Sequence, residues 1–427
     1  MRLAVIGGGS TYTPELIDGV LRRRDRLPIA EIALCDINTE RLDIVAGFAR
    51  RMVAHSGGGI TIHTTSSQAE AVRGARFVVS QFRIGQQAAR HRDELLGREF
   101  NLVGQETVGV GGFAKGLRTI PVALKLADTI LAEAPDAQLL NFTNPAGMIT
   151  EALLRERPAL NTIGLCNVPW NVKNEIATTL GYSFNQLELD YVGLNHLSWV
   201  RGIKAEGVDI SESAIGGFRG LTGKQAPGDD DPIWHPENID ILEAIPNYYL
   251  LYYYETQQWL RYQQNHPTRA SEVMAIEADL LKQYADESLV EKPADLMKRG
   301  GAYYSDSAAE LMADIASDAG TIHIVNTRNA GAVPGMNADE VMEMPAVIGA
   351  NGATPIATSA MRPDINALVR SVKDFELLTI RAAVDADEDS ALRALITNPL
   401  GPDLSEAPQV WKRLKEEHRG LLGALDD

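Results

Sequence analysis

Leu3-Ala4-Val5-Ile6-Gly7-Gly8-Gly9-Ser10-Thr11-Tyr12-Thr13-Pro14-Glu15 is the stretch that decides the fold of this chain. Its first four residues are apolar and typical of a short buried β-strand, and three glycines follow directly. Thr13 and Pro14 are then expected as a helix N-cap and first helical residue. A strand, a glycine-rich turn and a helix N-terminus in this order form the usual site for a dinucleotide pyrophosphate. The stretch therefore predicts a dinucleotide cofactor and redox chemistry.

The glycine pattern and one aspartate specify the cofactor further. Gly7 and Gly9 fit the first two glycines of the G-x-G-x-x-G fingerprint, whereas Tyr12 occupies the third position. Asp36 closes the second predicted strand, where its carboxylate can accept hydrogen bonds from a ribose diol and disfavour a 2′-phosphate. We therefore expect NAD rather than NADP, bound by Gly7, Gly9, Ser10, Thr11 and Asp36.

Strands and helices alternate through the first part of the chain, which predicts a mostly parallel sheet with helices on both faces. The strands are expected at residues 2–6, 31–35, 60–64, 77–81, 137–142 and 162–165. We interpret residues 1–165 as a Rossmann-like, doubly wound NAD-binding domain of the lactate/malate dehydrogenase type. Residues 166–427 would form a second, α+β domain for catalysis, substrate binding and oligomerisation. Helices are expected there at 248–265, 270–284, 306–317 and 366–386, short strands at 191–194 and 321–326, and a loop at 216–231.

Composition excludes some partners. The chain has 427 residues, 45% hydrophobic and 23% charged, and a formal net charge of -17. Nucleic acids and anionic membranes need a cationic face, so neither is expected as a partner. The first strand begins too early for a secretory signal, no apolar run reaches membrane-spanning length, and only Cys35 and Cys166 are present. We therefore expect a cytoplasmic protein with reduced thiols.

Cys166 and His196 each follow a short apolar strand, and a thiolate with an imidazole suits a divalent transition metal. The alternative is a buried cysteine that serves only as a small hydrophobic group. Five tyrosines lie within residues 248–254. Most are expected to pack as aromatic rings, but one near a metal could act as a base through a lowered pKa. The residues alone do not select which one.

Polar residues follow the fourth and fifth predicted strands, at the sheet edge where a substrate would meet the cofactor. Arg83 and Arg90 come after the fourth strand, and a guanidinium suits a phosphate because its planar fork binds two oxygens. Surface salt bridges with Asp93 or Glu94 are the alternative. Asn144 follows the fifth strand and could face the nicotinamide ribose or substrate hydroxyls. It could also cap the next helix, and the two roles are compatible.

Together these motifs resemble the NAD-dependent glycosidases of glycoside hydrolase family 4, and within it the 6-phospho-β-glucosidases. The resemblance rests on residues 7–10, 12–15, 104–107, 111–112, 141–145, 166–169 and 193–196, on Lys292-Pro293 and on Arg299-Gly300-Gly301. It covers nearly the whole chain. One departure is Gln86, which stands where the family usually has a second glycine after Arg-Ile-Gly.

The resemblance implies an enzyme that hydrolyses phosphorylated β-glucosides. NAD⁺ would oxidise carbon 3 of the sugar transiently, a proton would leave carbon 2, the aglycone would be eliminated, and water would add before the hydride returns. Cys166 and His196 would bind Mn²⁺ or another divalent metal. Tyr249, with Tyr248 as the alternative, would be the base.

The remaining roles are carried over in the same way. Arg90, Asn144, Asn167 and Arg269 would hold the substrate, and Arg83 and Asn144 would also contact the cofactor. Asn167, next to the metal cysteine, would belong to the catalytic group. It stands where the α-specific enzymes typically have aspartate, which favours a β-linked substrate. A homodimer or homotetramer is implied as well.

Two other classes of protein share part of this pattern. A 2-hydroxy-acid dehydrogenase of the lactate/malate type would have the same sheet. It needs a histidine–aspartate relay and an arginine for the substrate carboxylate, and residues 167–171 contain neither carboxylate nor arginine. A non-enzymatic NAD sensor would need the cofactor site but no metal.

Overall fold

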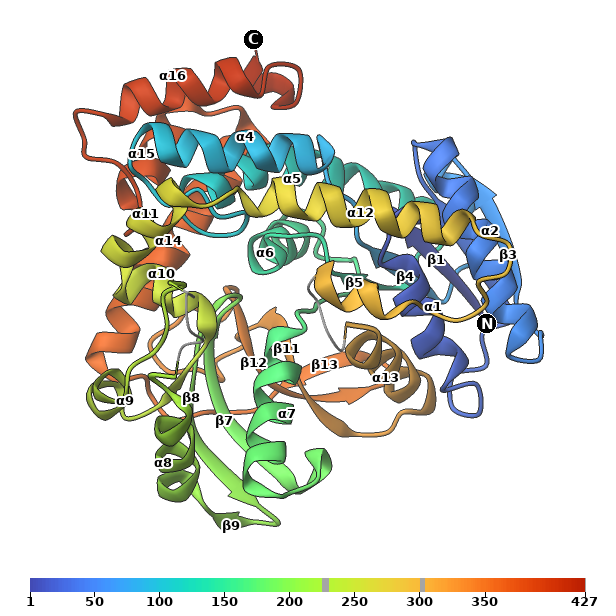
Figure 1. Cartoon of the computed structure of the whole chain (residues 1–427), viewed down its shortest axis with the longest axis horizontal. Coiled ribbons are helices and arrows are strands. Elements are labelled where there is room, and N and C mark those ends of the chain that lie inside the picture. The colour runs from blue at the N-terminus through green and yellow to red at the C-terminus, as the bar shows by residue number, and fades with distance from the viewer. Residues whose placement is uncertain (225–229, 300–303, 427) are drawn as a thin grey trace.

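A nine-stranded sheet forms the centre of the computed structural model, which describes residues 1–224, 230–299 and 304–426. The strand order is β13-β12-β11-β6-β5-β4-β1-β2-β3 (Figure 1). The parallel strands are β1 (Arg2–Ile6), β2 (Glu31–Cys35), β3 (Thr61–Thr65), β4 (Phe77–Ser80), β5 (Gln138–Asn141) and β6 (Thr162–Gly164). This confirms the doubly wound parallel sheet. The six predicted strands are present, each within one residue of its predicted ends.

Alternating side chains of β1 divide between two hydrophobic cores, because successive residues of a strand point to opposite faces. Leu3 and Val5 pack with α1 (Thr13–Leu21), α2 (Thr39–His55) and α13 (Tyr304–Ser317). Ala4 and Ile6 pack with α3 (Gln68–Val72), α5 (Gly109–Glu133), α6 (Ala146–Glu156) and α14 (Pro363–Asp385). Both faces of the sheet are therefore covered, as its apolar strands require.

The second half of the chain extends this sheet. The antiparallel strands β11 (Thr321–Arg328), β12 (Val341–Gly349) and β13 (Gly352–Pro355) continue it beyond β6. A separate sheet contains β7 (Leu187–Leu194), β8 (Leu197–Ala205), β9 (Val208–Asp209) and β10 (Ile245–Pro246). The predicted boundary after residue 165 lies between β6 and α7 (Val168–Leu180), and the two predicted domains share one sheet.

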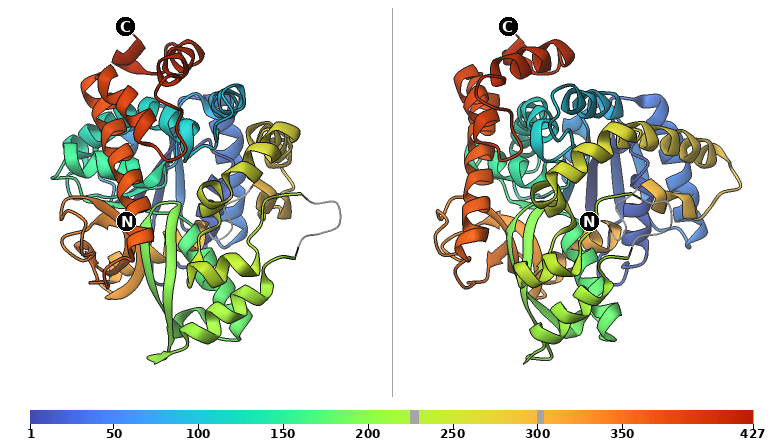
Figure 2. Two further views of the ribbon diagram at one scale, coloured as in Figure 1. Left: turned by 90° about the vertical axis from the view of Figure 1, so that its left-hand side faces the viewer. Right: turned by 60° about the vertical axis from the view of Figure 1, so that its left-hand side comes forward.

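Two long helices border the carboxyl ends of the parallel strands. Helix α4 (Gln86–Glu99) follows β4, and α12 (Arg269–Ala285) packs against both α4 and α2, before the short helix η3 (Ala294–Arg299). Figure 2 shows the red C-terminal helices along one side of the molecule, where α14 packs on α5 and α15 (Glu388–Thr397). Helix α16 (Ala407–Glu417) contacts α4. None of the described helices is both long and apolar enough to cross a membrane.

Several local predictions were wrong. The helix expected at 248–265 is broken into η2 (Tyr248–Leu250), α10 (Leu251–Tyr254) and α11 (Thr256–Asn265). The break follows from Thr256, whose hydroxyl donates to the carbonyl of Tyr252 at 2.7 Å and so replaces a backbone donor. The short strands expected at 191–194 and 321–326 are confirmed, as parts of the longer β7 and β11.

Two further differences concern ends of elements. The N-cap of α1 is Tyr12 rather than Thr13, because the Thr13 hydroxyl donates to the carbonyl of Gly8 at 2.8 Å instead of accepting from the helix. The loop expected at 216–231 begins later, since α8 (Ser211–Leu221) continues to Leu221, and α9 (Pro236–Leu242) follows. Residues 225–229 of that predicted loop lie outside the described residues.

Candidate active site

The glycine turn joins β1 to α1 at the carboxyl edge of the sheet, between β4 and β2, where the strand order reverses. A Cβ atom on Gly7 would lie 2.8 Å from the backbone nitrogen of Phe82, and Gly7 has a φ of +89°. A Cβ on Gly9 would lie 2.9 Å from a carboxylate oxygen of Asp36. Both positions therefore require glycine, and the turn presents bare backbone beside the N-terminus of α1, as a pyrophosphate site requires.

Asp36 holds this turn in place. Its carboxylate accepts hydrogen bonds from the backbone nitrogens of Gly9 and Asn38, each at 3.0 Å. A carboxylate has about four acceptor positions, so two such bonds leave capacity for the hydroxyls of a ribose. The position after β2 and the spare acceptors fit the adenosine ribose of NAD.

Cys166 and His196 are brought together although 30 residues separate them. Cys166 follows β6, His196 lies in the tight turn between β7 and β8, and the Cys166 Sγ and His196 Nε2 atoms are 3.3 Å apart. Metal–ligand bonds of about 2.3 Å to sulfur and about 2.1 Å to nitrogen would hold the two atoms roughly 3 to 3.6 Å apart. The pair therefore fits one divalent ion.

Burial sets the protonation of both groups. It lowers the pKa of His196 to about 3, so the imidazole is neutral, which is the form that binds metals. It raises the pKa of the Cys166 thiol to about 12, and a nearby divalent cation would favour the thiolate instead. Among the described residues, no third histidine, cysteine or carboxylate completes a cluster with this pair. Further coordination positions would thus fall to substrate or water oxygens.

Two tyrosines of the cluster border the same cavity. The Tyr249 ring lies parallel to the His196 ring, with centroids 3.8 Å apart, whereas Tyr248 packs edge-on against Tyr249 and is 49% exposed. Burial and the charge of Glu106 raise the pKa of Tyr249 above its usual value. Tyr249 would therefore need a nearby cation to act as a base near neutral pH.

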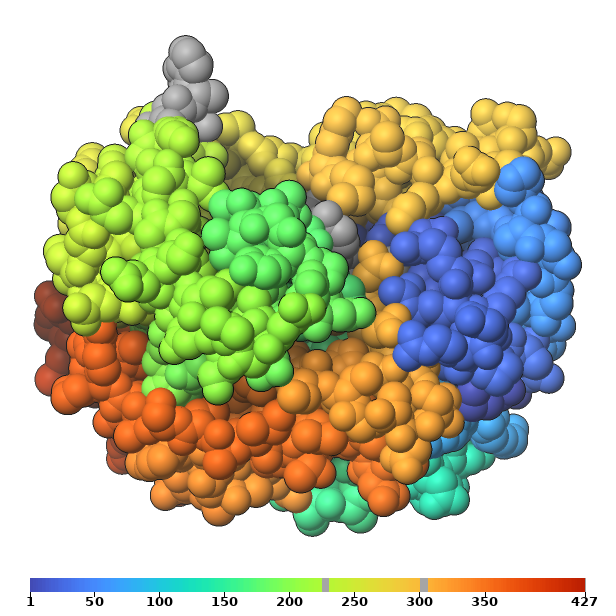
Figure 3. All heavy atoms as spheres, turned by 90° about the horizontal axis from the view of Figure 1, so that it is seen from below, coloured from blue at the N-terminus to red at the C-terminus, as the bar shows by residue number. Residues whose placement is uncertain are grey.

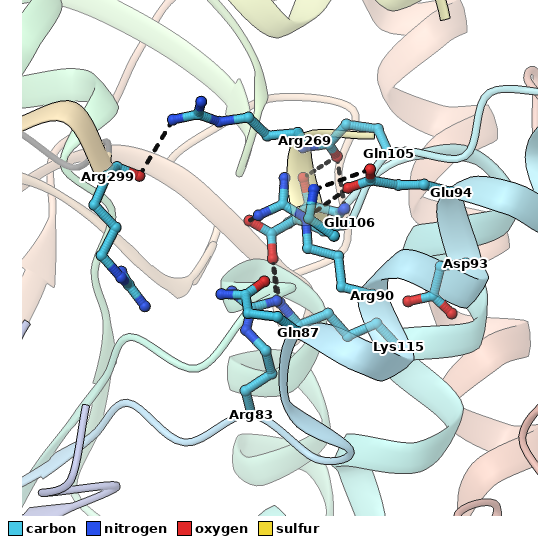
Figure 4. Close-up of polar contacts among 12 residues, drawn as sticks. Arg83, Gln87, Arg90, Asp93, Glu94, Gln105, Glu106, Lys115, Arg269 and Arg299 are labelled. Carbon is cyan, nitrogen blue, oxygen red and sulfur yellow. Dashed lines mark hydrogen bonds and ion pairs between the residues drawn. The ribbon is translucent and has the colours of Figure 1, made fainter. Parts of the chain in front are cut away.

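A buried ion cluster follows β4, and Figure 4 shows its members converging on Glu106. Lys115 Nζ donates to the Glu106 carboxylate at 2.8 Å, Arg83 pairs with the same oxygen, and Arg90 Nη1 lies 3.5 Å from the other. Although burial raises it, the pKa of Glu106 is held well below its usual value by these cations. Burial, with Arg83 beside it, lowers the pKa of Lys115 to about 7.

Arg90 is buried between two carboxylates. Its Nε atom donates to Glu94 at 2.7 Å, so the salt bridge considered as an alternative exists, but in the interior rather than on the surface. Asp93 instead binds Arg118 through both oxygens, at 2.9 and 2.5 Å. The guanidinium of Arg90 also borders the cavity described next, so a structural and a ligand-binding role coexist.

A cavity of about 500 Å³ is lined by most of the residues that were predicted to bind the substrate or the metal. Figure 3 shows a hollow on this side of the molecule, between the blue N-terminal residues and the green residues that begin with α7. The cavity is lined by Arg83, Arg90, Asn144, Cys166, Asn167, His196, Tyr248, Tyr249 and Arg269. Gly7, Gly9, Ser10, Thr11 and Asp36 are absent from this lining. The turn reaches it through the neighbouring Tyr12.

Two of the lining residues have further contacts that bear on their roles. The N-cap of α6 is Pro145 rather than Asn144, but Asn144 Oδ1 accepts from the backbone nitrogen of Ala146, the first residue of α6, at 3.3 Å while Asn144 lines the cavity. Arg269 begins α12, and its guanidinium donates to Glu272 at 2.9 Å and to the carbonyl of Lys298 at 3.0 Å. Gln86, the departure from the family pattern, is exposed with a φ of +55° and does not line the cavity.

Sequence reasoning did not assign roles to several residues of this site. Glu106 and Lys115 organise the arginines, and the ring of Tyr12 lies 4.0 Å from the guanidinium carbon of Arg299, which binds Glu277. The run Gly104-Gln105-Glu106-Thr107 contributes to the family resemblance, but the sequence alone predicts no role for its side chains. The available signal in the sequence was a charged residue, Glu106, placed between Gly104 and the glycines at 109, 111 and 112. Gly300 and Gly301 of the Arg-Gly-Gly motif lie outside the described residues.

Two family models and a curated relative match nearly the whole chain. The model of the family 4 glycosyl hydrolases matches residues 2–182, and the model of the family's C-terminal domain matches residues 191–401. A probable 6-phospho-beta-glucosidase of Bacillus subtilis is 40% identical over 432 residues, covering 99% of this chain and 97% of the relative.

Solved structures extend the comparison. The 6-phospho-beta glucosidase of Thermotoga maritima, solved with manganese, NAD⁺ and glucose-6-phosphate, superposes with a TM-score of 0.92 at 36% identity and covers 98% of both chains. A lactate dehydrogenase of Eimeria maxima, solved with NADH and oxamate, gives a TM-score of 0.54 at 16% identity, covering 90% of this chain and 94% of its own. The second likeness concerns the fold alone.

Proposed function

We propose the reaction of this chain from one premise: the chain belongs to the family 4 glycosyl hydrolases. It is a 6-phospho-β-glucosidase that depends on NAD⁺ and Mn²⁺. One observation in this structure carries the assignment of residues. A thiol and an imidazole 3.3 Å apart face the same cavity as a set of arginines, beside a dinucleotide-type glycine turn.

When bound, NAD⁺ supplies a temporary hydride acceptor and the divalent ion a Lewis acid, which together make the hydrogen on carbon 2 of the sugar acidic. Cys166 and His196 hold the metal in our proposal, and the glycine turn with Asp36 and Arg83 holds the cofactor. Tyr249 removes the proton from carbon 2. Its position against His196 supports this choice over Tyr248. Elimination of the aglycone, addition of water across carbons 1 and 2, and return of the hydride to carbon 3 would complete the hydrolysis with no net change in the cofactor.

We assign substrate recognition to side chains that line the cavity. Arg90 and Arg269 provide guanidinium groups for the sugar phosphate, and Asn144 provides an amide for hydroxyls. Asn167 lies next to the metal cysteine. The α-specific members of the family typically have aspartate at this position, so by the family resemblance Asn167 supports a β-linked substrate.

We also propose a division of the chain at residue 165, a homodimeric or homotetrameric assembly and a cytoplasmic location. The metal thiol Cys166 and the buried Cys35 are free in the structure, which suits a reducing compartment. The assembly rests on the family resemblance, and sedimentation equilibrium measures it directly.

A substrate screen tests the proposed reaction. The purified enzyme is assayed with 4-nitrophenyl glucoside 6-phosphates of α and β configuration, each with and without NAD⁺, Mn²⁺ and thiol. We expect release of 4-nitrophenol from the β compound only when NAD⁺ and the metal are both present, and no net NADH. Net NADH formation from a 2-hydroxy acid, with no glycoside cleavage, would instead identify a dehydrogenase.

The metal assignment has its own test. Cys166→Ser is expected to abolish both Mn²⁺ binding and turnover while leaving NAD⁺ binding intact, because Asp36 and the glycine turn are separate from the thiol. Cys35→Ser, at the other buried cysteine, is the matched control and should retain Mn²⁺ binding. Full activity of the wild type after rigorous metal removal would contradict the assignment.

A further inference from the structure

The turn that carries His196 is held from the far side of the imidazole by a threonine. Thr107 precedes α5, is 9% exposed, and its Oγ1 atom lies 2.7 Å from His196 Nδ1. His196 itself has a φ of +65°, a left-handed conformation that is uncommon for residues other than glycine but that histidine adopts more often than most. Thr107 is therefore placed to decide how this imidazole is oriented and which of its nitrogens carries the proton.

The direction of the Thr107–His196 hydrogen bond follows from Gln105. The Gln105 Oε1 atom accepts from the backbone nitrogens of Thr107, at 2.6 Å, and Val108, at 3.1 Å. Two backbone donors at one side-chain atom require that atom to be the amide oxygen, because the amide nitrogen has no acceptor capacity. The orientation of the Gln105 amide is thus determined by the backbone.

The same oxygen lies 2.7 Å from Thr107 Oγ1. A hydroxyl has a single proton, and at this distance from an amide oxygen it must be donated to that oxygen. Thr107 Oγ1 can then only accept from His196. The Nδ1 atom of His196 carries the proton, and the lone pair of Nε2 points to Cys166 Sγ at 3.3 Å.

We infer that Gln105 and Thr107 are positioning residues that select the Nδ1–H tautomer of His196 and so keep Nε2 ready to bind the divalent metal. This inference rests on the proposed function for the identity of the ion. Histidine ligands of metals generally donate their second ring N–H to a fixed acceptor. Here that acceptor is the neutral hydroxyl of Thr107. The amide oxygen of Gln105, just before α5, accepts the hydroxyl proton and so leaves the hydroxyl oxygen to accept from His196.

Substitutions at Thr107 test the inference through metal affinity. Thr107→Val removes the hydroxyl at nearly constant volume, and Thr107→Ser retains it. We expect the Mn²⁺ dissociation constant, measured by calorimetry on the metal-free enzyme, to rise roughly ten- to hundredfold in the valine variant and to stay within about threefold of wild type in the serine variant. Saturating Mn²⁺ should restore most of the turnover of Thr107→Val.

Thr119→Val is the matched control. Thr119 lies on α5, is 1% exposed, and its hydroxyl has no hydrogen-bond partner among the described residues. The same substitution there removes a buried hydroxyl without touching His196, so Mn²⁺ affinity should not change. An equal loss of affinity in both valine variants would show a general packing effect and overturn the inference.

A second measurement does not depend on metal binding. Nitrogen-15 spectra of the metal-free wild type, labelled on histidine, report the tautomer of each ring, and the signals that disappear in His196→Gln identify His196. We expect the Nδ1–H form in the wild type and a loss of that preference in Gln105→Met, which frees the Thr107 hydroxyl to donate. An Nε2–H tautomer in the wild type would overturn the inference even if every variant is poorly folded.

These outcomes separate the inference from the proposed function. If the wild type binds no divalent metal and cleaves no glucoside, the proposed function fails, yet the nitrogen-15 spectra still decide the tautomer. If the wild type binds Mn²⁺ and Thr107→Val binds it equally well, the inference fails and the proposed function stands.

Discussion

The ring of Tyr249 lies flat against the imidazole of His196, with centroids 3.8 Å apart and planes inclined by 5°. His196 belongs to the hairpin of β7 and β8, and Tyr249 belongs to the short helix η2 after β10, which pairs with β8. The same small sheet therefore positions both the proposed metal ligand and the proposed base. A cation bound at His196 would lie close enough to Tyr249 to lower the pKa that burial raises.

Tyr249→Phe should separate the base from the metal site. The phenyl ring retains the stacking on His196, so Mn²⁺ and NAD⁺ affinities should be unchanged. Loss of the phenol removes the proton acceptor, and we expect kcat to fall by about 10² to 10⁴. Steady-state kinetics and calorimetry measure the two effects. Tyr248→Phe is the matched control with a much smaller expected loss, and the reverse ranking of the two variants would assign the base to Tyr248.

Asp36 should set the choice between NAD⁺ and NADP⁺. Its carboxylate already faces two backbone donors and would repel a 2′-phosphate. We expect NADP⁺ to support little turnover in the wild type. Asp36→Ser should weaken NAD⁺ binding and bring the activation constants of NAD⁺ and NADP⁺ closer together. Activation constants for both cofactors provide the measurement. Equal use of the two cofactors by the wild type would contradict this role.

Arg269 should recognise the phosphate of the substrate. A lysine keeps the charge but loses the planar fork, so Arg269→Lys should raise KM for the phosphorylated substrate roughly tenfold or more and change kcat little. Arg261→Lys, at an exposed position on α11, is the matched control. A loss that is equally large for unphosphorylated 4-nitrophenyl glucoside would exclude phosphate recognition as the cause.

Glu277 should contribute pH-dependent stability. Although burial opposes it, Arg299 and Arg41 lower the pKa of Glu277 to about 2. A carboxyl whose pKa falls on folding stabilises the native state above its unfolded pKa, and this contribution is lost as pH falls toward the folded value. The free energy of unfolding of the wild type should therefore exceed that of Glu277→Gln by about 3 kcal/mol near neutral pH and by only about 2 kcal/mol near pH 3.5.

Urea unfolding of both proteins at the two pH values measures this difference. Asp279→Asn removes an exposed carboxylate from the same helix, α12, and is the control for the general effect of charge at low pH. A stability difference between wild type and Glu277→Gln that is independent of pH would show that the ion pairs with Arg299 and Arg41 do not account for it.

The parallel sheet could be predicted from sequence because its signals are local. Each strand is a short apolar run bounded by turn residues. Gly7 marks a position where a side chain would collide with neighbouring backbone, and Gly9 a position where it would collide with the carboxylate of Asp36. Most of β11 was predicted as a strand at 321–326, but its place in the sheet was not, since the pairing of β11 with β6 joins residues far apart in the chain. The break between α10 and α11 could not be predicted from the continuous aromatic pattern of residues 248–254, because the hydroxyl of Thr256 produces it.

The sequence allowed many individual residues of the site to be predicted, but not the contacts that their side chains make with one another. Cys166, His196 and Arg90 were chosen from their positions after strands and from the family resemblance, and all three line one cavity. The roles of Glu106, Lys115 and Gln105 depend on which group each side chain meets. Spacing along the chain carries no information about those contacts.

The exchange of one proton tests the central claim most directly. The enzyme is allowed to hydrolyse 4-nitrophenyl β-glucoside 6-phosphate in D₂O with NAD⁺ and Mn²⁺, and the glucose-6-phosphate produced is examined by proton NMR. Removal of the proton from carbon 2 by Tyr249, followed by addition of solvent, predicts deuterium at carbon 2 of the product. A product that retains its original hydrogen at carbon 2 would contradict proton abstraction and the elimination that depends on it.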